Sequence, residues 1–225
     1  MFVGHYAAAF ALKGKEPSVS LGMLFIGVQL VDIFFFPFAL YGIESLHFED
    51  SHNQVNNFVM EFPYTHGLLA SIVWSLAFIL LYLIWPSKKK KTSRIALFLG
   101  LSVVSHWFVD LLVHTPDLPL VHGDPKYGFG LWQNKHMAFS AELSLLVVCW
   151  CYYFFKSQAK SKSRQFFMVL FLLFLIAVNT LNFYVLPASE NLEELTINAL
   201  AAYFILALLA GAFDLKRKEK KPATT

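Results

Sequence analysis

Six long apolar segments divide this chain, and they limit its possible folds more than any other feature. They cover residues 18–43, 65–85, 94–114, 136–156, 165–186 and 195–213. A helix needs about 20 apolar residues to cross the hydrocarbon core of a bilayer. A soluble chain of this length forms one core without needing several such runs. The pattern therefore predicts an all-α fold, a polytopic transmembrane helical bundle of about six spans.

The composition agrees with a lipid environment. Of the 225 residues, 57% are hydrophobic, only 15% are charged, and the mean hydropathy is +0.54. Soluble domains carry about 25% charged residues. The net charge of +3 comes from a few basic blocks, so it indicates topology and gives no reason to expect a nucleic-acid partner. The expected partner is the membrane lipid bilayer.

The basic residues predict the orientation of the bundle. One side of a six-span arrangement collects Lys13, Lys15, Lys88, Lys89, Lys90, Lys91, Arg94, Lys156, Lys160, Lys162, Arg164, Lys216, Arg217, Lys218, Lys220 and Lys221. Only Lys126 and Lys135 fall on the other side. By the positive-inside rule, both termini are cytoplasmic. Binding of anionic lipid headgroups is an additional role for these clusters.

This orientation also divides the chain into parts. Loops 44–64, 115–135 and 187–194 are expected to face outward. We expect a single transmembrane domain over residues 1–214, followed by a basic cytoplasmic tail over 215–225.

The first twelve residues are apolar but too short to span a membrane. A helix of this length reaches about 18 Å. It either lies flat on the membrane or forms a half-helix surrounded by the other spans, which would bring His5 towards the midplane. We expect this segment to belong to the mature protein because it lacks the basic start of a signal peptide. Cys149 and Cys151 point in different directions on a helix, so no disulfide is expected.

Several ionisable residues lie inside the apolar segments. Asp32 is near the middle of the first, where a charge costs about 2.5–3.5 kcal/mol and needs a partner. His106 and Asp110 are four residues apart and share one helical face, which suits chelation of a metal ion. His114 continues that face, and His66 begins the second segment. A rise of about 1.5 Å per residue puts most of these groups near the midplane and outer half, so a shared cluster is predicted.

Other roles for these residues remain open. A single histidine or aspartate in a membrane is often part of a hydrogen bond between helices. A proton relay is the main functional alternative to a metal site.

The order of these motifs resembles a known family. The matching residues are Gly4-His5, Asp32, Tyr64-Thr65-His66 and Ser105-His106 with Asp110. They are similar to the membrane-bound metal-dependent hydrolases, whose best-known bacterial members are inner-membrane proteins under LexA control, with a distant similarity to zinc-dependent phospholipase C. The resemblance covers about residues 1–150. It implies a divalent metal, with zinc expected because of the histidines, held by His5, Asp32, His66, His106 and Asp110.

The chain also departs from the family pattern. Residues 30–34 read LVDIF where the family commonly has P-D-x-D-H, and residues 61–67 read EFPYTHG where it has H-R-G-x-T-H-S. These differences leave three outcomes open: fewer metal ions, a divergent substrate or lost activity.

Two further features surround the candidate site. Glu142 is the only acidic residue in the fourth segment, and it could serve as a sixth ligand, a catalytic general base or an interhelical hydrogen-bond partner. The aromatic and glycine-rich loop 123–134 either caps the site or forms part of an interfacial aromatic belt, and the belt is the favoured prediction. His114, Asp117 and His136 are expected near the mouth of the site.

The sequence thus leads to one main functional hypothesis and two alternatives. The main hypothesis is a metal-dependent hydrolase acting on a lipid-like phosphoester or a related substrate in a bacterial inner membrane. A non-enzymatic alternative is an ion-coupled transporter or permease using Asp32, His106 and Asp110. A degenerate scaffold without chemistry is the other. Neither the substrate nor the oligomeric state follows from the sequence.

Overall fold

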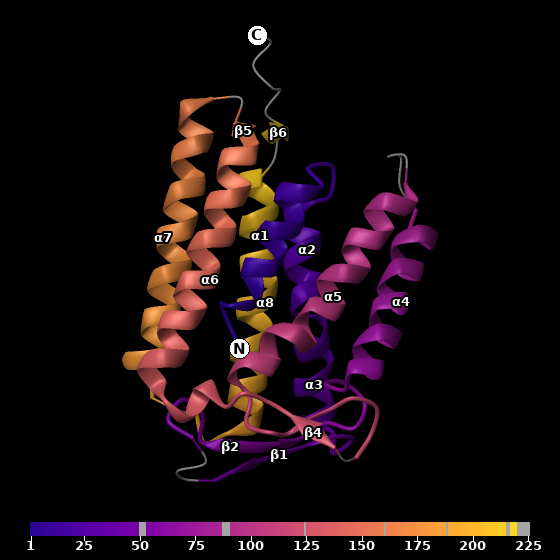
Figure 1. The fold of residues 1–225 in the computed structure, drawn as a ribbon, viewed down its shortest axis with the longest axis vertical. Coiled ribbons are helices and arrows are strands. Elements are labelled where there is room, and N and C mark those ends of the chain that lie inside the picture. Colours follow the sequence, from indigo (N-terminus) through magenta and orange to yellow (C-terminus); the bar gives the residue numbers. More distant parts are fainter. Residues whose placement is uncertain are drawn as a thin grey trace.

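The computed structural model is a helical bundle with short strand pairs near its ends (Figure 1). It describes residues 1–49, 53–86, 91–123, 125–159, 161–187, 189–214 and 217–219. The helices are α1 (His5–Lys15), α2 (Leu21–Val28), α3 (Leu30–Leu40), α4 (Leu68–Ile84), α5 (Ser93–Val113), α6 (Lys135–Lys156), α7 (Lys162–Tyr184) and α8 (Leu192–Asp214). The predicted all-α fold is confirmed.

The strands are short and pair antiparallel. The pairs are β1 (Ser45–Phe48) with β2 (Phe58–Glu61), β3 (Leu118–Pro119) with β4 (Lys126–Tyr127), and β5 (Ser157–Ala159) with β6 (Arg217–Glu219). A single 3-10 turn, η1 (Leu131–Gln133), precedes α6. The first two pairs lie at one end of the bundle, and the third lies at the opposite end (Figure 1).

Polar residues directly precede five of the described helices. Ser20, Thr92, Asn134, Ser161 and Asn191 each accept a hydrogen bond from the backbone N–H three residues further on. Such caps satisfy backbone donors that have no partner within the helix. The residue at which each of these helices starts is therefore determined by the local sequence.

Four helices, α5, α6, α7 and α8, are long and apolar enough to span a bilayer. The pair α2 and α3 becomes a fifth span if it is counted as one element, although it bends by 44° at Gln29. Helix α4 has 17 residues and is shorter than the others. The chain is an integral membrane protein, and the predicted count of about six spans is reached only when the bent pair and α4 are both included.

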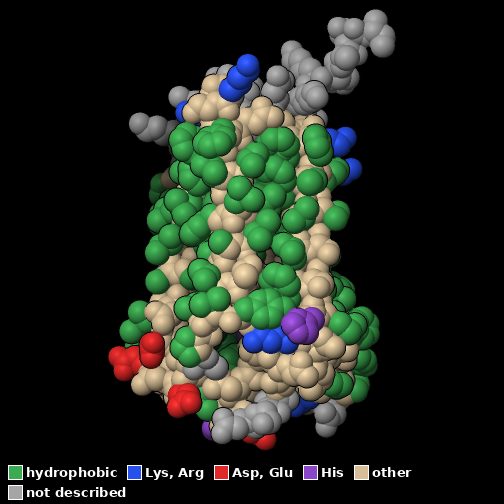
Figure 2. All heavy atoms as spheres, turned by 90° about the vertical axis from the view of Figure 1, so that its left-hand side faces the viewer, with side chains coloured by type: hydrophobic (Ala, Val, Ile, Leu, Met, Phe, Trp, Pro, Cys, Tyr) green, Lys and Arg blue, Asp and Glu red, His purple; other side chains and the backbone are tan. Residues whose placement is uncertain are grey.

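The sides of the bundle are apolar. In Figure 2, hydrophobic side chains cover the middle of the face shown, while charged side chains lie towards the ends. Leu76, Val148 and Leu208 are examples of large side chains that point outwards, with exposed fractions of 60%, 66% and 74%. Such a surface is suited to contact with lipid.

Helix α1 lies inside the bundle, against α2, α5 and α6 (Figure 1). Tyr6 and Phe10 are fully buried. Of the two predictions for the N-terminal segment, the half-helix surrounded by protein is therefore the one that the structure supports. Cys149 and Cys151 on neighbouring α6 are free cysteines.

An apolar cluster fills the half of the bundle on the side of the α6–α7 connection. It includes Phe25, Leu146 and Phe171. At its end, Lys13 Nζ lies 2.7 Å from Asp214 Oδ2, and the Tyr153 hydroxyl donates to Asp214 Oδ1. The polar residues singled out in the sequence lie in the other half, towards the β1–β2 hairpin.

Candidate metal centre

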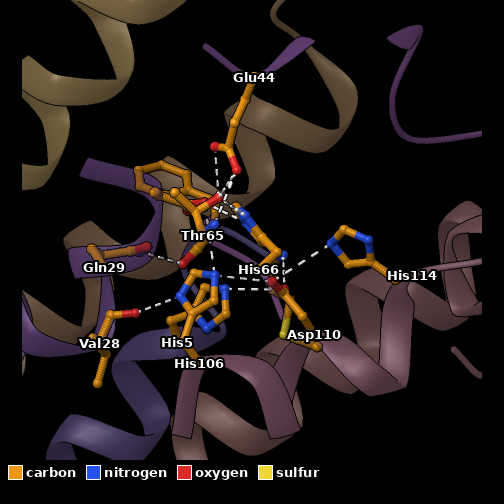
Figure 3. A network of polar contacts seen from close by, with 12 residues as sticks. His5, Val28, Gln29, Glu44, Thr65, His66, His106, Asp110 and His114 are labelled. Atoms are coloured by element: carbon orange, nitrogen blue, oxygen red, sulfur yellow. Dashed lines mark hydrogen bonds and ion pairs between the residues drawn. The ribbon is translucent and has the colours of Figure 1, made fainter. Parts of the chain in front are cut away.

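The five predicted metal ligands meet inside the bundle. They come from α1, α3, the turn before α4, and α5, and they are His5, Asp32, His66, His106 and Asp110. Figure 3 labels His5, His66, His106 and Asp110 among them. All five are buried. Segments far apart in the sequence thus place imidazole and carboxylate groups around one point.

The distances within this cluster are short. Asp110 Oδ1 lies 3.1 Å from His5 Nε2, and Asp110 Oδ2 lies 3.0 Å from His106 Nε2. Asp32 Oδ1 lies 3.1 Å from His66 Nε2 and 3.7 Å from His106 Nε2. Two sets of three residues each have ligand atoms within 4.8 Å of one another: His5, Asp32 and His106, and His66, His106 and Asp110. His106 belongs to both sets.

The break between α2 and α3 orients His106. Its Nδ1 lies 2.7 Å from the carbonyl oxygen of Val28, the last residue of α2. A carbonyl only accepts hydrogen bonds, so Nδ1 carries the proton and donates it. A neutral ring then has its Nε2 lone pair directed into the cluster. A histidine that binds a metal through one ring nitrogen typically donates the N–H of the other ring nitrogen, here Nδ1, to a carbonyl or carboxylate oxygen.

A chain of three residues orients His66. The carboxylate of Glu44 accepts hydrogen bonds from the backbone N–H groups of Tyr64 and Thr65 and from the Thr65 hydroxyl. Thr65 Oγ1 lies 2.8 Å from His66 Nδ1. Because the hydroxyl proton goes to the carboxylate, Oγ1 accepts from Nδ1–H. His66 Nε2 lies within hydrogen-bond distance of Asp32 Oδ1, at 3.1 Å, and a metal ion bound there would displace the Nε2 proton. Burial raises the pKa of the Glu44 carboxyl, and these hydrogen bonds act in the opposite direction.

His114 adds a fourth histidine at the edge of the cluster. Its Nε2 lies 3.6 Å from Asp110 Oδ2, and its Nδ1 lies 2.9 Å from Asp117 Oδ1. The sequence predicts both residues near the mouth, and the shared face of His106, Asp110 and His114 is observed. His136 instead lies on the exposed side of α6, where it contacts Tyr184 away from the cluster.

Some nitrogen atoms in the cluster have no hydrogen-bond partner among the described residues. They are both ring nitrogens of His5 and Nε2 of His106. The neighbouring carboxylate oxygens are close, but the directions do not suit hydrogen bonds. The two rings stack with centroids 3.9 Å apart. Buried polar atoms without partners call for an explanation, and a bound ion is one that suits this donor set.

Other polar groups complete the surroundings. The Met1 amino group lies 2.6 Å from Asp110 Oδ1, and the Tyr203 hydroxyl donates to Asp32 Oδ2 at 3.1 Å. Glu142 is buried and accepts a hydrogen bond from the backbone N–H of Gly4. Glu142 thus makes an interhelical hydrogen bond, one of the roles considered for it. It lies outside both ligand sets.

A cavity of about 350 Å³ adjoins the cluster. Asp32, His66, Asp110, His114 and Glu142 line it together with mainly apolar and aromatic side chains. The described walls contain no lysine or arginine; besides the histidines, the Met1 amino group, which pairs with Asp110, is the positively charged group that faces the three carboxylates. The remaining negative charge is suited to a bound cation.

The loop 123–134 contributes to the cavity through one residue. Trp132 is buried, lines the cavity and packs on the ring of His114. Phe129 is 71% exposed. Trp132 therefore helps to cap the site, while the interfacial aromatic belt stays a prediction.

The fold and the site together define an integral membrane protein with a buried histidine–carboxylate centre. Comparison of the chain with models of known families, with characterised proteins and with solved structures finds no match. The resemblance to the membrane-bound hydrolases therefore stays a prediction based on the motifs.

Proposed function

We propose that this protein is a membrane-embedded, metal-dependent hydrolase that acts on a lipid-like phosphoester or a related substrate. One observation carries the proposal: three histidines and two aspartates from three helices and a turn converge in a buried cluster, and His66 and His106 turn their Nε2 atoms inwards. Imidazole nitrogen and carboxylate oxygen are ligands that zinc prefers in catalytic sites. Zinc is therefore the expected ion.

The chemistry requires metal and protein groups together. A bound divalent ion supplies Lewis acidity and lowers the pKa of water to about 7. The His66 and His106 rings and the carboxylates of Asp32 and Asp110 would hold the ion. Glu142 lines the same cavity and, as a general base, would accept a proton from water during attack on the substrate.

The proposed substrate and the proposed membrane location are based on the cavity walls, the family resemblance and the pattern of basic residues. The cavity walls are mostly apolar, which suits the hydrocarbon part of an amphiphile. The phosphoester comes from the family resemblance, as does a bacterial inner membrane. The lysine and arginine pattern supports a cytoplasmic C-terminal end and an outward-facing hairpin end. The N-terminal amino group does not reach the cytoplasm as the pattern predicts, because it lies inside the bundle beside Asp110.

An ion-coupled permease is supported less well. Contacts from His114 through Asp110, His106 and Asp32 to His66 form a continuous polar chain that could carry protons. The apolar cluster around Phe25 occupies much of the other half of the bundle, and the polar group of Lys13, Tyr153 and Asp214 lies at its end. This arrangement suits chemistry at a site reached from one side.

Elemental analysis of purified protein tests the proposal. We expect stoichiometric zinc in the wild type and in His136→Ala, a control that removes an exposed histidine outside the cluster. The double variant His106→Ala/Asp110→Ala is expected to lose the metal while remaining folded. Absence of metal from carefully prepared wild type would instead support a degenerate scaffold. Zinc transport into liposomes without hydrolysis of lipid phosphoesters would support the permease.

A further inference from the structure

The cavity opens on one side of the bundle. Among its described lining residues, Asn182, Leu186 and Asn198 are exposed, and the others are buried or half-buried. Asn182 lies in the last turn of α7, Leu186 follows that helix, and Asn198 lies near the start of α8. The mouth therefore lies between the hairpin-side ends of α7 and α8.

The β1–β2 hairpin covers the end of the cavity. Its Val55 and Phe58 line the cavity. The Asn57 side chain donates to the Ser189 carbonyl in the α7–α8 connection. On the other side, the Gln54 backbone N–H donates to the carbonyl of Trp132. These contacts fasten the hairpin on both sides and leave the gap between α7 and α8 as the exposed entrance.

This entrance lies in a surface suited to lipid. Leu181, Val185 and Ile197, close to the entrance in sequence, are large exposed apolar residues. Asn182 and Asn198 interrupt this surface with side-chain amides near the ends of their helices, where a span approaches the polar interface of a bilayer. An amide offers both donors and acceptors to the ester and phosphate oxygens of a lipid.

A path of small and apolar side chains leads inwards from the entrance. Val178 on α7 and Ala199 and Ala202 on α8 line it, followed by Tyr203. The Tyr203 hydroxyl contacts Asp32 of the metal cluster. The cavity is therefore continuous from a lipid-facing surface to the candidate centre.

We propose that a membrane phospholipid enters sideways between α7 and α8 from the leaflet at the hairpin end. Asn182 and Asn198 contact its polar region at the entrance, the headgroup side reaches the histidine–aspartate cluster, and the acyl chains remain between α7 and α8 and in the bilayer. The reaction of this lipid and the position of its anionic headgroup beside the carboxylates rest on the proposed function, because a bound metal ion supplies the positive charge there. The entry of its acyl chains does not, because the lateral entrance between α7 and α8, here called the portal, consists of residues outside the metal cluster.

Photolabelling in a bilayer tests whether a lipid enters the cavity between α7 and α8. The full-length protein is placed in phosphatidylglycerol nanodiscs that contain a phospholipid with a diazirine on its acyl chain, and labelled residues are mapped by mass spectrometry. Wild type is expected to carry label at cavity residues such as Val178 and Leu195. Ala202→Trp fills the path and is expected to lose most of this label. Ala201→Trp, on the exposed side of α8, should retain it. Ala199→Trp provides a second blocked variant if Ala202→Trp does not fold.

The outcomes separate the portal from the hydrolase. Label restricted to the outer surface of wild type, or equal cavity label in a folded Ala202→Trp, would overturn the portal. The same experiment with His106→Ala/Asp110→Ala is expected to retain cavity label without zinc. If the wild type takes up lipid but contains no metal, the portal stands and the hydrolase fails. If it hydrolyses a short-chain soluble phosphoester but shows no cavity label, the hydrolase stands and the portal fails.

Discussion

At the residue scale, hydrogen bonds made by Nδ1 define the orientation of the His66 and His106 rings. His106 donates to the Val28 carbonyl, and His66 donates to Thr65, whose hydroxyl donates to Glu44. Each contact selects the tautomer in which Nε2 can bind an ion. Partners of this kind often affect metal affinity nearly as much as the ligands themselves.

The Glu44 contact predicts a specific effect on zinc affinity. Glu44→Gln retains the shape of the side chain, but its amide can donate to Thr65 Oγ1. The Thr65 hydroxyl would then donate to His66 Nδ1, which leaves the proton on Nε2 and opposes metal binding. We expect zinc affinity to fall by about 10–100-fold, as measured by competition with a chelator. Glu61→Gln, an exposed residue on β2, is the control and should bind zinc normally. Unchanged affinity in Glu44→Gln would show that Glu44 only supports the fold.

Glu142 provides a test of a catalytic role. If it is the general base, Glu142→Gln should keep stoichiometric zinc and lower kcat by about 10²–10⁴-fold. The Gly4 backbone N–H can still donate to the amide oxygen, so the interhelical contact is retained. The measurements are metal content and the rate of phospholipid hydrolysis. Loss of zinc would identify Glu142 as a ligand, and an unchanged rate would leave it a structural role only.

At the element scale, glycines permit a close crossing of α2 and α8. A Cβ atom on Gly22 would lie 2.7 Å from the Ala207 carbonyl oxygen and 3.2 Å from Gly211 Cα. A Cβ atom on Gly211 would meet nothing nearer than Gly22 Cα at 3.6 Å, which is an ordinary contact. Small residues at helix crossings are common in membranes because association there depends on close packing.

Substitution of alanine for glycine should lower stability at Gly22 on α2 but not at Gly211 on α8. Gly22→Ala is expected to lower the free energy of unfolding by about 1–3 kcal/mol, since backbone atoms must move apart. Gly211→Ala should have little effect, because its added methyl group has room. Unfolding in mixed micelles, followed by circular dichroism, gives both values. Equal losses for the two variants would contradict this asymmetric crossing.

At the scale of the whole molecule, the two ends differ. The β1–β2 hairpin and the β3–β4 pair lie at one end, and the β5–β6 pair lies at the other (Figure 1). His66 precedes α4 and His114 follows α5, and both lie towards the first of these ends. Several of the basic residues that predict orientation, among them Lys88, Lys89 and Lys90, fall outside the described residues. The assignment of inside and outside therefore rests on the sequence pattern.

Reporter fusions test this orientation. An enzyme that is active only outside the cytoplasm should be active when joined after Asn56 and inactive when joined after Lys91. The positive-inside rule is the physical reason, because basic loops are retained on the cytoplasmic side. The opposite pattern would reverse the orientation and place the site at the cytoplasmic leaflet.

The sequence by itself determined that the chain forms apolar helices and which polar residues within them gather. Long runs without charge have few alternatives to a membrane helix, and polar groups placed in such runs are costly enough to stand out. Asp32, His106 and Asp110 were identifiable for this reason, whereas the ligand roles of His5 and His66, at or outside the ends of these runs, came from the motif resemblance. The i,i+4 spacing is also sufficient to put His106, Asp110 and His114 on one face of a helix.

Only the tertiary structure decided how these groups are supported and how the site opens. Glu44 follows the first apolar segment, where a carboxylate is unremarkable in the sequence, so its burial and its contact with Thr65 have no signal there. The bend at Gln29, the burial of α1 and the entrance between α7 and α8 depend on packing between segments distant along the chain. The local sequence shows which polar residues lie in apolar segments, where burial is costly. Which group contacts each of them, and so offsets this cost, depends on how distant segments pack together.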